Sequence, residues 1–382
     1  MDKRTVWALI LSFIVIITYT KIIAPPPPKD TNAAQKGAVD ATPVHKDVAS
    51  ETKETPKDAE ILTVEKGVVP QKLSTVRNAS MDLAYSPLGG CISRAILDRS
   101  EIIKKGPVEL IQPLLPPIQP ITLSIPNVAE DRGDAAYDLI EEGAGGRVVA
   151  FRKVFGTLVV VKRFTAGQQG YVVDSSIELE NTGQDAISLA GMTVSAGAVF
   201  ALGQAEKDRY LGVDFLDRNG KIHRCPGAKL SRERDEKADI KWLALRNQFF
   251  TVVLKPRDGA VGYNAAAVRL SDELRGVRGG VKLAPMELKA GEKRSIQLGL
   301  YIGPKEYTAL SSFGAVDVMD FGWFGFLGRW ILAGLNFLYR ICGNYGIAII
   351  LLTILIRLIL YPLNQKSFRS MKEMQKLQPK IA

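Results

Sequence analysis

The sequence contains very few cysteines and histidines. Three cysteines occur in 382 residues, Cys91, Cys225 and Cys342, and they are too few and too scattered for a disulfide framework or a zinc site. A bridge between Cys91 and Cys225 and a pair of buried free thiols both stay open. The only histidine after His45 is His223, and no nucleophile elbow lies near it. A zinc protein and a triad hydrolase are therefore both disfavoured.

Other enzyme signatures are also weak. The glycine-rich residues 143–146 lack the Lys-Ser/Thr of a P-loop, and residues 275–280 are predicted to form a loop. Asp174, Glu178 and Glu180 could mimic a glycosidase carboxylate pair, but alternation with apolar residues predicts the solvent face of a strand. We therefore expect no enzyme activity, no catalytic residue, no metal and no cofactor.

The positive charge is unevenly distributed. The net charge is +10, but residues 22–322 carry nearly equal numbers of basic and acidic side chains. The excess lies beside the apolar segments near the two ends of the chain. It is therefore typical of membrane flanks and not of a DNA-binding surface, and we expect no specific nucleic-acid partner.

An apolar run near the N-terminus, residues 6–23, is long enough to span a bilayer at about 27 Å. The alternative is a cleaved signal peptide, since basic residues precede the run. No small-x-small cleavage site follows it, and a proline comes directly after Ala24. We therefore predict an uncleaved transmembrane anchor over residues 1–24.

A second apolar run, with a predicted span over residues 346–363, carries a single charge, Arg357. Basic residues mark the cytoplasmic flanks of spans, so Lys3 and Arg4 place the N-terminus inside. The predicted cytoplasmic segment, residues 364–382, is basic through Lys366, Arg369, Lys372, Lys376 and Lys380. Both termini are therefore predicted in the cytoplasm, and the middle of the chain outside.

A third apolar stretch, residues 323–340, could cross the membrane or lie in its headgroups. A crossing would leave an uncharged turn and put the basic tail on the wrong side. Charged and amide side chains gather on one side of the predicted helix and indole rings on the other, which is typical of an interfacial helix. We predict such a helix within residues 306–345. Its predicted anchors are Trp323, Trp330, Arg329 and Arg340.

Between these segments the chain changes character twice. Residues 25–59 are rich in proline and polar residues and predict a flexible linker. Residues 60–305 show short alternating runs bounded by turn residues, and no long helical pattern alternates with them. The fold class is therefore a membrane protein of mixed α and β structure, with a large antiparallel β-sandwich outside the membrane. The strands are predicted at 147–152, 158–164, 171–181 and 241–254.

Short motifs accompany this order of segments. They are Trp242 with Gln248-Phe-Phe250, Leu300-Tyr-Ile-Gly-Pro-Lys-Glu-Tyr307, Gly343-Asn-Tyr-Gly346, Tyr361-Pro-Leu363, and Met374-Gln-Lys-Leu-Gln-Pro-Lys-Ile381. The motifs and their order resemble the YidC/Oxa/Alb family of membrane insertases over nearly the whole chain. The resemblance implies a periplasmic sandwich similar to sugar-mutarotase folds, without their chemistry.

The resemblance also implies a mechanism. Arg357 matches an arginine that lies in a hydrophilic groove within the membrane and receives the polar part of a segment being inserted. From the residues alone, Arg357 could equally reach the cytoplasmic headgroups along its own stem. The basic segment 364–382 resembles the start of a cytoplasmic helical hairpin, and contact with anionic lipid or ribosomal RNA stays open beside packing.

The expected function is a non-enzymatic insertase and folding factor in a Gram-negative inner membrane. Its expected partners are nascent inner-membrane proteins, the Sec translocon, the ribosome and the lipid bilayer. The family core has five spans, so we expect a truncated chain that lacks most of the groove. The alternative is a membrane-anchored periplasmic module that binds glycans or envelope proteins.

Overall fold

The protein is described from a computed structural model. It describes residues 61–67, 73–97, 107–115, 118–126, 135–143, 147–168, 170–203, 206–270, 274–320 and 325–377. The predicted N-terminal anchor and the predicted linker lie outside these residues.

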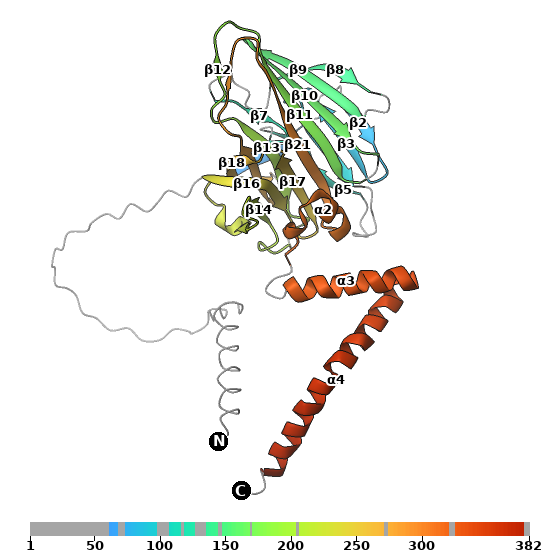
Figure 1. Ribbon diagram of the computed structural model, residues 1–382. Coiled ribbons are helices and arrows are strands. Elements are labelled where there is room, and N and C mark those ends of the chain that lie inside the picture. Colours follow the sequence, from blue (N-terminus) through green and yellow to red (C-terminus); the bar gives the residue numbers. More distant parts are fainter. Residues whose placement is uncertain are drawn as a thin grey trace, which may run out of the picture. The chain divides into compact units, whose positions relative to one another are not determined.

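Most strands belong to one large sheet. They are β1 (Leu62–Lys66), β6 (Leu114–Leu115), β7 (Leu123–Ser124), β8 (Asp138–Glu142), β9 (Val148–Phe155), β10 (Leu158–Ala166), β11 (Val172–Asn181), β13 (Thr193–Phe200), β14 (Gly212–Asp217), β15 (Ile222–Pro226), β16 (Arg234–Arg246), β17 (Phe250–Pro256), β18 (Ala260–Leu270), β19 (Arg275–Lys282) and β21 (Lys293–Pro304). Their order is β7-β13-β19-β18-β16-β17-β21-β11-β10-β9-β8, with β1 beside β18 and β14 beside β16. Figure 1 shows part of this order, with β8, β9, β10 and β11 as neighbouring strands. The neighbours along this order pair antiparallel.

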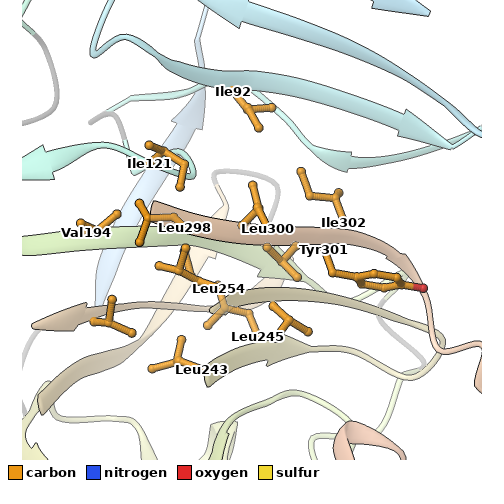
Figure 2. Close-up of a cluster of buried hydrophobic side chains, with 14 of the residues drawn as sticks. Ile92, Ile121, Val194, Leu243, Leu245, Leu254, Leu298, Leu300, Tyr301 and Ile302 are labelled. Atoms are coloured by element: carbon orange, nitrogen blue, oxygen red, sulfur yellow. The ribbon is translucent and has the colours of Figure 1, made fainter. Parts of the chain in front are cut away.

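Two smaller sheets complete the β domain. They consist of β2 (Ser74–Arg77), β3 (Met81–Ser86), β4 (Cys91–Leu97) and β5 (Val108–Ile111), and of β12 (Ile187–Ser188) with β20 (Glu287–Leu288). Figure 2 shows Leu298, Leu300 and Ile302 of β21 between Ile92 of β4 on one side and Leu254 of β17 on the other. All five side chains are buried. The predicted antiparallel β-sandwich is confirmed.

Alternation along β11 explains why one side of the sheet carries carboxylates. Val173, Ile177 and Leu179 are fully buried, while Asp174 and Glu178 are exposed. Strand side chains alternate between the two faces, so one face packs and the other is solvated. The prediction that these carboxylates form a solvated strand face is confirmed.

One sequence prediction that differs from the structure concerns strand β19. Residues 275–280, predicted as a loop, lie in β19 and pair with both β13 and β18. A Cβ on Gly276 would lie 2.5 Å from Cδ1 of Phe200, and one on Gly280 would lie 2.7 Å from the carbonyl oxygen of Val194. These glycines therefore allow close approach of neighbouring strands and do not mark a turn.

The predicted strand run 241–254 is divided into β16 and β17 by a turn at Asn247. Its Oδ1 accepts hydrogen bonds from the backbone N–H groups of Phe249 (3.1 Å) and Phe250 (2.8 Å). Its Nδ2 donates to the carbonyl of Phe200 at 3.0 Å, and the side chain is fully buried. An asparagine that binds its own backbone two and three residues on reverses the chain within an apolar run.

Helices follow the last strand. They are α2 (Tyr307–Phe313), the short 3-10 helix η4 (Val316–Val318), α3 (Gly325–Cys342) and α4 (Tyr345–Leu377); the 3-10 helix η3 (Gly227–Lys229) lies within the β domain. Within the described residues, one helical segment, Tyr345–Pro362, is long and apolar enough to cross a membrane. The helix continues unbroken past residue 364, where the span is predicted to give way to a cytoplasmic segment. That boundary stays a prediction.

Candidate functional site

A short turn places α3 and α4 beside each other. Gly343 adopts a left-handed φ of 65°, and its N–H donates to the carbonyl of Tyr339 at 2.7 Å, which ends α3. Asn344 then caps α4, since its Oδ1 accepts from the N–H groups of Gly346 (2.7 Å) and Ile347 (3.4 Å). The motif 343–346 is therefore a helix stop followed at once by a helix start.

One face of α4 packs against α3. The rings of Tyr339 and Tyr345 stack with centroids 3.9 Å apart, and Ala348 is fully buried. A Cβ on Gly334 would lie 3.5 Å from Cδ1 of Leu352, so the glycine lets the two helices approach. Tyr345, Ala348 and Leu352 thus mark the side of α4 that faces α3.

A polar stripe runs along another side of α4. It consists of Thr353, Arg357, Tyr361 and Asn364, which fall within about 80° of one another on the helix and about 150° from the side facing α3. All four side chains are exposed. Thr353 returns its hydroxyl to the carbonyl of Ile349 at 2.7 Å, and Gln365 donates to the hydroxyl of Tyr361 at 2.9 Å. The packing against α3 therefore leaves Arg357 uncovered.

The other predicted helical residues are only partly described. Trp330 and Arg340 are exposed on α3, whose exposed apolar side chains also include Phe337 and Ile341. Arg329 is on the same helix, and Lys366, Arg369, Lys372 and Lys376 are on α4, as far as the backbone shows. Trp323 and Lys380 lie outside the described residues. The roles of all these residues stay predictions.

A second cluster of charges lies where the chain leaves the sandwich. Asp214 on β14 is fully buried, and its Oδ2 accepts from Nε of Arg246 (2.7 Å) and Nη1 of Arg224 (3.0 Å). Nη1 of Arg246 also donates to the carbonyl of Tyr210 at 2.8 Å. Nη2 of Arg224 donates to the carbonyl of Asp317 at 3.1 Å, within η4. We call Asp214, Arg224 and Arg246 the exit cluster, because it ties the segment after the last strand to the sheet.

The two β-domain motifs meet at this exit. The N–H of Lys305 donates to the carbonyl of Phe249 at 2.8 Å, and its amine donates to the carbonyl of Asn247. Burial, reinforced by the guanidinium of Arg246, lowers the pKa of Lys305 to about 8. The hydroxyl of Tyr301 donates to the carbonyl of Pro304 at 2.6 Å. Both motifs thus build the exit of the chain from the sandwich.

The remaining candidates from the sequence do not assemble into a reactive centre. Nε2 of His223 lies 2.9 Å from Oδ2 of Asp217, and its ring stacks on Phe215 at 4.6 Å. The hydrogen bond from His223 lowers the pKa of the Asp217 carboxyl. Glu180 pairs with Lys293 on the next strand at 3.0 Å. Within the described residues, no group of His, Cys, Asp and Glu is placed to hold a metal.

The cysteines form no disulfide. Cys91 and Cys225 are both buried within the β domain, and Cys342 is half-buried on α3. Of the two alternatives open from the sequence, the structure therefore contains the buried thiols.

A large antiparallel sandwich with a fixed exit leads here into an amphipathic helix and an apolar helix that bears an arginine. This arrangement defines a class of β-sandwich proteins that carry an amphipathic and an apolar helix after the last strand. Residues 74–333 match the family model of the YidC periplasmic domain, and residues 337–382 match that of the 60Kd inner membrane protein. The chain therefore belongs to the YidC family of membrane protein insertases, whose members are inner-membrane proteins.

Curated relatives align with the whole chain. The membrane protein insertase YidC of Syntrophus aciditrophicus is 27% identical over 407 residues, which cover 100% of this chain and 74% of the relative. The membrane protein insertase YidC of Geobacter metallireducens is 27% identical over 397 residues, covering 100% of this chain and 72% of the relative. The resemblance found from the motifs is confirmed.

Solved structures show a more distant likeness. A galactose mutarotase-like protein from Lactobacillus casei covers 60% of this chain and 100% of its own, with 12% identity and a TM-score of 0.43. A galactose mutarotase related enzyme from Lactobacillus acidophilus covers 60% and 97%, with 10% identity and a TM-score of 0.44. Such a likeness assigns no sugar chemistry to this chain.

Proposed function

We propose that this chain inserts and folds inner-membrane proteins through a polar groove, of which the stripe on α4 forms one wall. The observation that supports the proposal is the position of Arg357, which lies in line with Thr353, Tyr361 and Asn364 and away from α3. A wet, charged groove shortens the apolar barrier that a translocating polar tail must cross, and so lowers its desolvation cost. No covalent step is needed.

The stripe also bears on the alternative that Arg357 only reaches the headgroups. That alternative involves the long side chain of Arg357 alone, about 9 Å of helix rise from residue 363. It gives no role to a polar residue deeper in the span. Thr353 lies about 6 Å deeper than Arg357 on the same side of the helix. Its hydroxyl oxygen keeps acceptor capacity after bonding to Ile349, so the polar side of α4 extends into the span.

The proposed topology follows the distribution of charge. The anchor over residues 1–24 and α4 both cross the membrane, the β domain is periplasmic, and the basic end of α4 is cytoplasmic. Nascent inner-membrane proteins are the substrates, and the Sec translocon and the ribosome are partners in their delivery. The basic residues from Lys366 onward face the cytoplasmic side, where ribosomes and anionic lipid are found.

The anchored binding module would need an exposed cleft in the β domain that is lined by aromatic side chains or by carboxylates. Of two hollows on the described surface, one is lined by Asp208, Arg269 and Arg275 among small and aliphatic residues, and the other by Glu178, Glu180 and Lys293 among others. Neither hollow is lined by an aromatic side chain that would stack on a sugar.

The test is complementation in cells depleted of their own insertase, scored by insertion of a short two-span reporter. The chain is expressed both as its 382 residues and with any downstream reading frame included. Arg357→Ala is expected to reduce insertion at least about tenfold, which corresponds to about 1.4 kcal/mol, and Arg357→Lys is expected to reduce it less. The matched control is Ile359→Ala, at nearly the same depth on the opposite side of α4. Equal insertion by Arg357→Ala and Ile359→Ala would sink the groove proposal.

A further inference from the structure

Two segments of the β domain form an exposed ledge beside its exit. Oε2 of the buried Glu206 accepts from the N–H of Leu202 at 2.8 Å, and Oε1 accepts from the N–H of Gln248 at 2.7 Å. One carboxylate therefore holds both backbones together. We call the described residues Leu202, Lys207, Arg209, Tyr210, Gln248 and Phe249 the exit ledge.

The exit ledge combines apolar tips with positive charge. Leu202 and Phe249 are 40% and 41% exposed, which is unusual for large apolar side chains of this domain. Lys207 and Arg209 are exposed, and the guanidinium of Arg209 lies 4.7 Å above the ring of Tyr210. The intervening carboxylate, Asp208, is paired with Arg275, so it does not neutralise them. Apolar tips, an aromatic ring and basic groups together are typical of surfaces that lie in anionic headgroups.

The chain itself limits how far this surface can lie from a membrane. Ala315 and Val318 are fully buried on the sandwich, and Asp320 lies 3.8 Å from Arg224 of the exit cluster. The helix α3 begins at Gly325. Five residue steps from Asp320 to Gly325 span at most about 18 Å, so Asp320, whose side chain reaches the exit cluster, lies within about that distance of the start of α3.

The exit cluster connects this limit to the ledge. Arg224 and Arg246 share Oδ2 of Asp214, and Arg246 binds the carbonyls of Arg209 (3.2 Å) and Tyr210 (2.8 Å). The segment that leads to α3 and the loop that carries the basic residues are therefore held by the same buried carboxylate. If α3 lies in the headgroups, the exit ledge lies close to the same surface.

We propose that the exit ledge docks on anionic lipid headgroups of the outer leaflet and so fixes the sandwich above the membrane. The inference rests on the proposed placement of α3 and α4 in the membrane. Phe249 and Leu202 enter the headgroup layer, while Lys207 and Arg209 bind lipid phosphates. The short tether and the net positive charge of the ledge favour lipid over a protein partner as the occupant.

The test uses the full chain in vesicles of phosphatidylcholine and phosphatidylglycerol, without any other protein. Cys342→Ser leaves only the two buried native thiols, so a nitrobenzoxadiazole probe can be attached at Phe249→Cys. Its matched control is Val154→Cys, where the side chain is 43% exposed. Through β10 and β11, Val154 aligns with Lys293, the first residue of β21, about 36 Å of strand from Pro304 at the exit.

Quenching of the probe by headgroup-labelled lipid is expected to be several-fold stronger at position 249 than at position 154. Replacing Lys207 and Arg209 with Gln is expected to lower the ratio of docked to undocked protein roughly tenfold, and added salt to act in the same direction. Equal quenching at the two positions would overturn the proposal and leave a protein partner or a second copy as the occupant. If quenching at position 249 is the same with and without the Gln substitutions of Lys207 and Arg209, the proposed contact with lipid phosphates is wrong. Arg357→Ala should leave the quenching unchanged, so a failure of docking and a failure of the groove are distinguishable.

Discussion

The β domain and the α3–α4 pair differ in how their charged side chains are surrounded. In the β domain the fully buried Asp214 is matched by two arginines, and neighbouring carbonyls take up further donors. On α4 the single charge of the span, Arg357, is exposed and lies away from the only described partner helix. A buried charge that stabilises a fold is enclosed by partners, whereas the role proposed for Arg357 requires a side chain that a substrate can reach.

The two regions also differ in how far their large apolar side chains are exposed. In the β domain most large apolar side chains are buried, with the exposed ones confined to a few positions such as Ile140, Val154 and Phe249. On α4 most of them are exposed, including Ile350, Leu358 and Ile359. Burial away from water drives the first arrangement, while lipid can cover the second.

The largest expected effect on folding is at the exit cluster. Asp214→Ala leaves two arginines without their buried carboxylate and is expected to destabilise the β domain by about 3 to 5 kcal/mol. The measurement is urea unfolding of the full chain in micelles, followed by pulse proteolysis. The control is Asp239→Ala, which removes an exposed pair with Arg218 and is expected to change stability by less than about 1 kcal/mol. Similar losses for both variants would mean that the exit cluster contributes no more than a surface pair.

The next effect concerns the glycine of the 300–307 motif. A Cβ on Gly303 would lie 2.6 Å from Cγ of Tyr171, so Gly303→Ala is expected to cost about 2 to 3 kcal/mol. Gly203→Ala, where a Cβ meets nothing within 4 Å, is the control in the same unfolding assay. In a Tyr171→Gly background, which removes both the ring and the Cβ that would lie 2.8 Å away, the cost of Gly303→Ala should largely vanish. An undiminished cost would show that the Tyr171 side chain is not its cause.

A smaller effect is expected from pH. The pKa of Lys305 is about 8 in the folded chain and about 10.4 in an unfolded one, so the unfolded state holds more protons between these values. Stability therefore rises with pH from about 8 to about 10.4, by roughly 2 kcal/mol. Lys305→Met should remove this rise, and Lys289→Met at an exposed position should keep it. A rise that persists in Lys305→Met would assign it to another group.

The smallest expected effect on folding belongs to Arg357. This variant gives the clearest contrast with the buried charges of the exit cluster. Arg357→Ala is expected to change the stability of the chain by less than about 0.5 kcal/mol, because no described contact is lost. The same variant is expected to lose insertion. A loss of stability comparable to that of Asp214→Ala would mean that Arg357 holds structure in the way the exit cluster does.

Features set by local spacing could be predicted from the sequence. Alternation at 171–181 predicts the strand and both of its faces, and the composition of 323–340 and 345–363 predicts two helices. The polar stripe could also be predicted, since Thr353, Arg357 and Tyr361 recur every four residues. These features depend on residues that are neighbours along one element.

Features that depend on distant partners could not be predicted. The three residues of the exit cluster are separated by 10 and 22 positions, and only the pairing of β14 with β15 and β16 brings them together. The glycines of β19 suggest a loop until the partner strands that crowd them are known. The turn at Asn247 is hidden in an apolar run because a single buried side chain makes it.

The most direct test of the central claim is site-specific photo-crosslinking to a stalled membrane-protein substrate. A photoreactive amino acid is placed at Thr353 and Tyr361 on the polar stripe, and at Ile359 on the opposite side of α4. The account predicts crosslinks from both stripe positions and few from Ile359. Equal crosslinking from all three positions, or crosslinks from Ile359 alone, would contradict a groove built on Arg357.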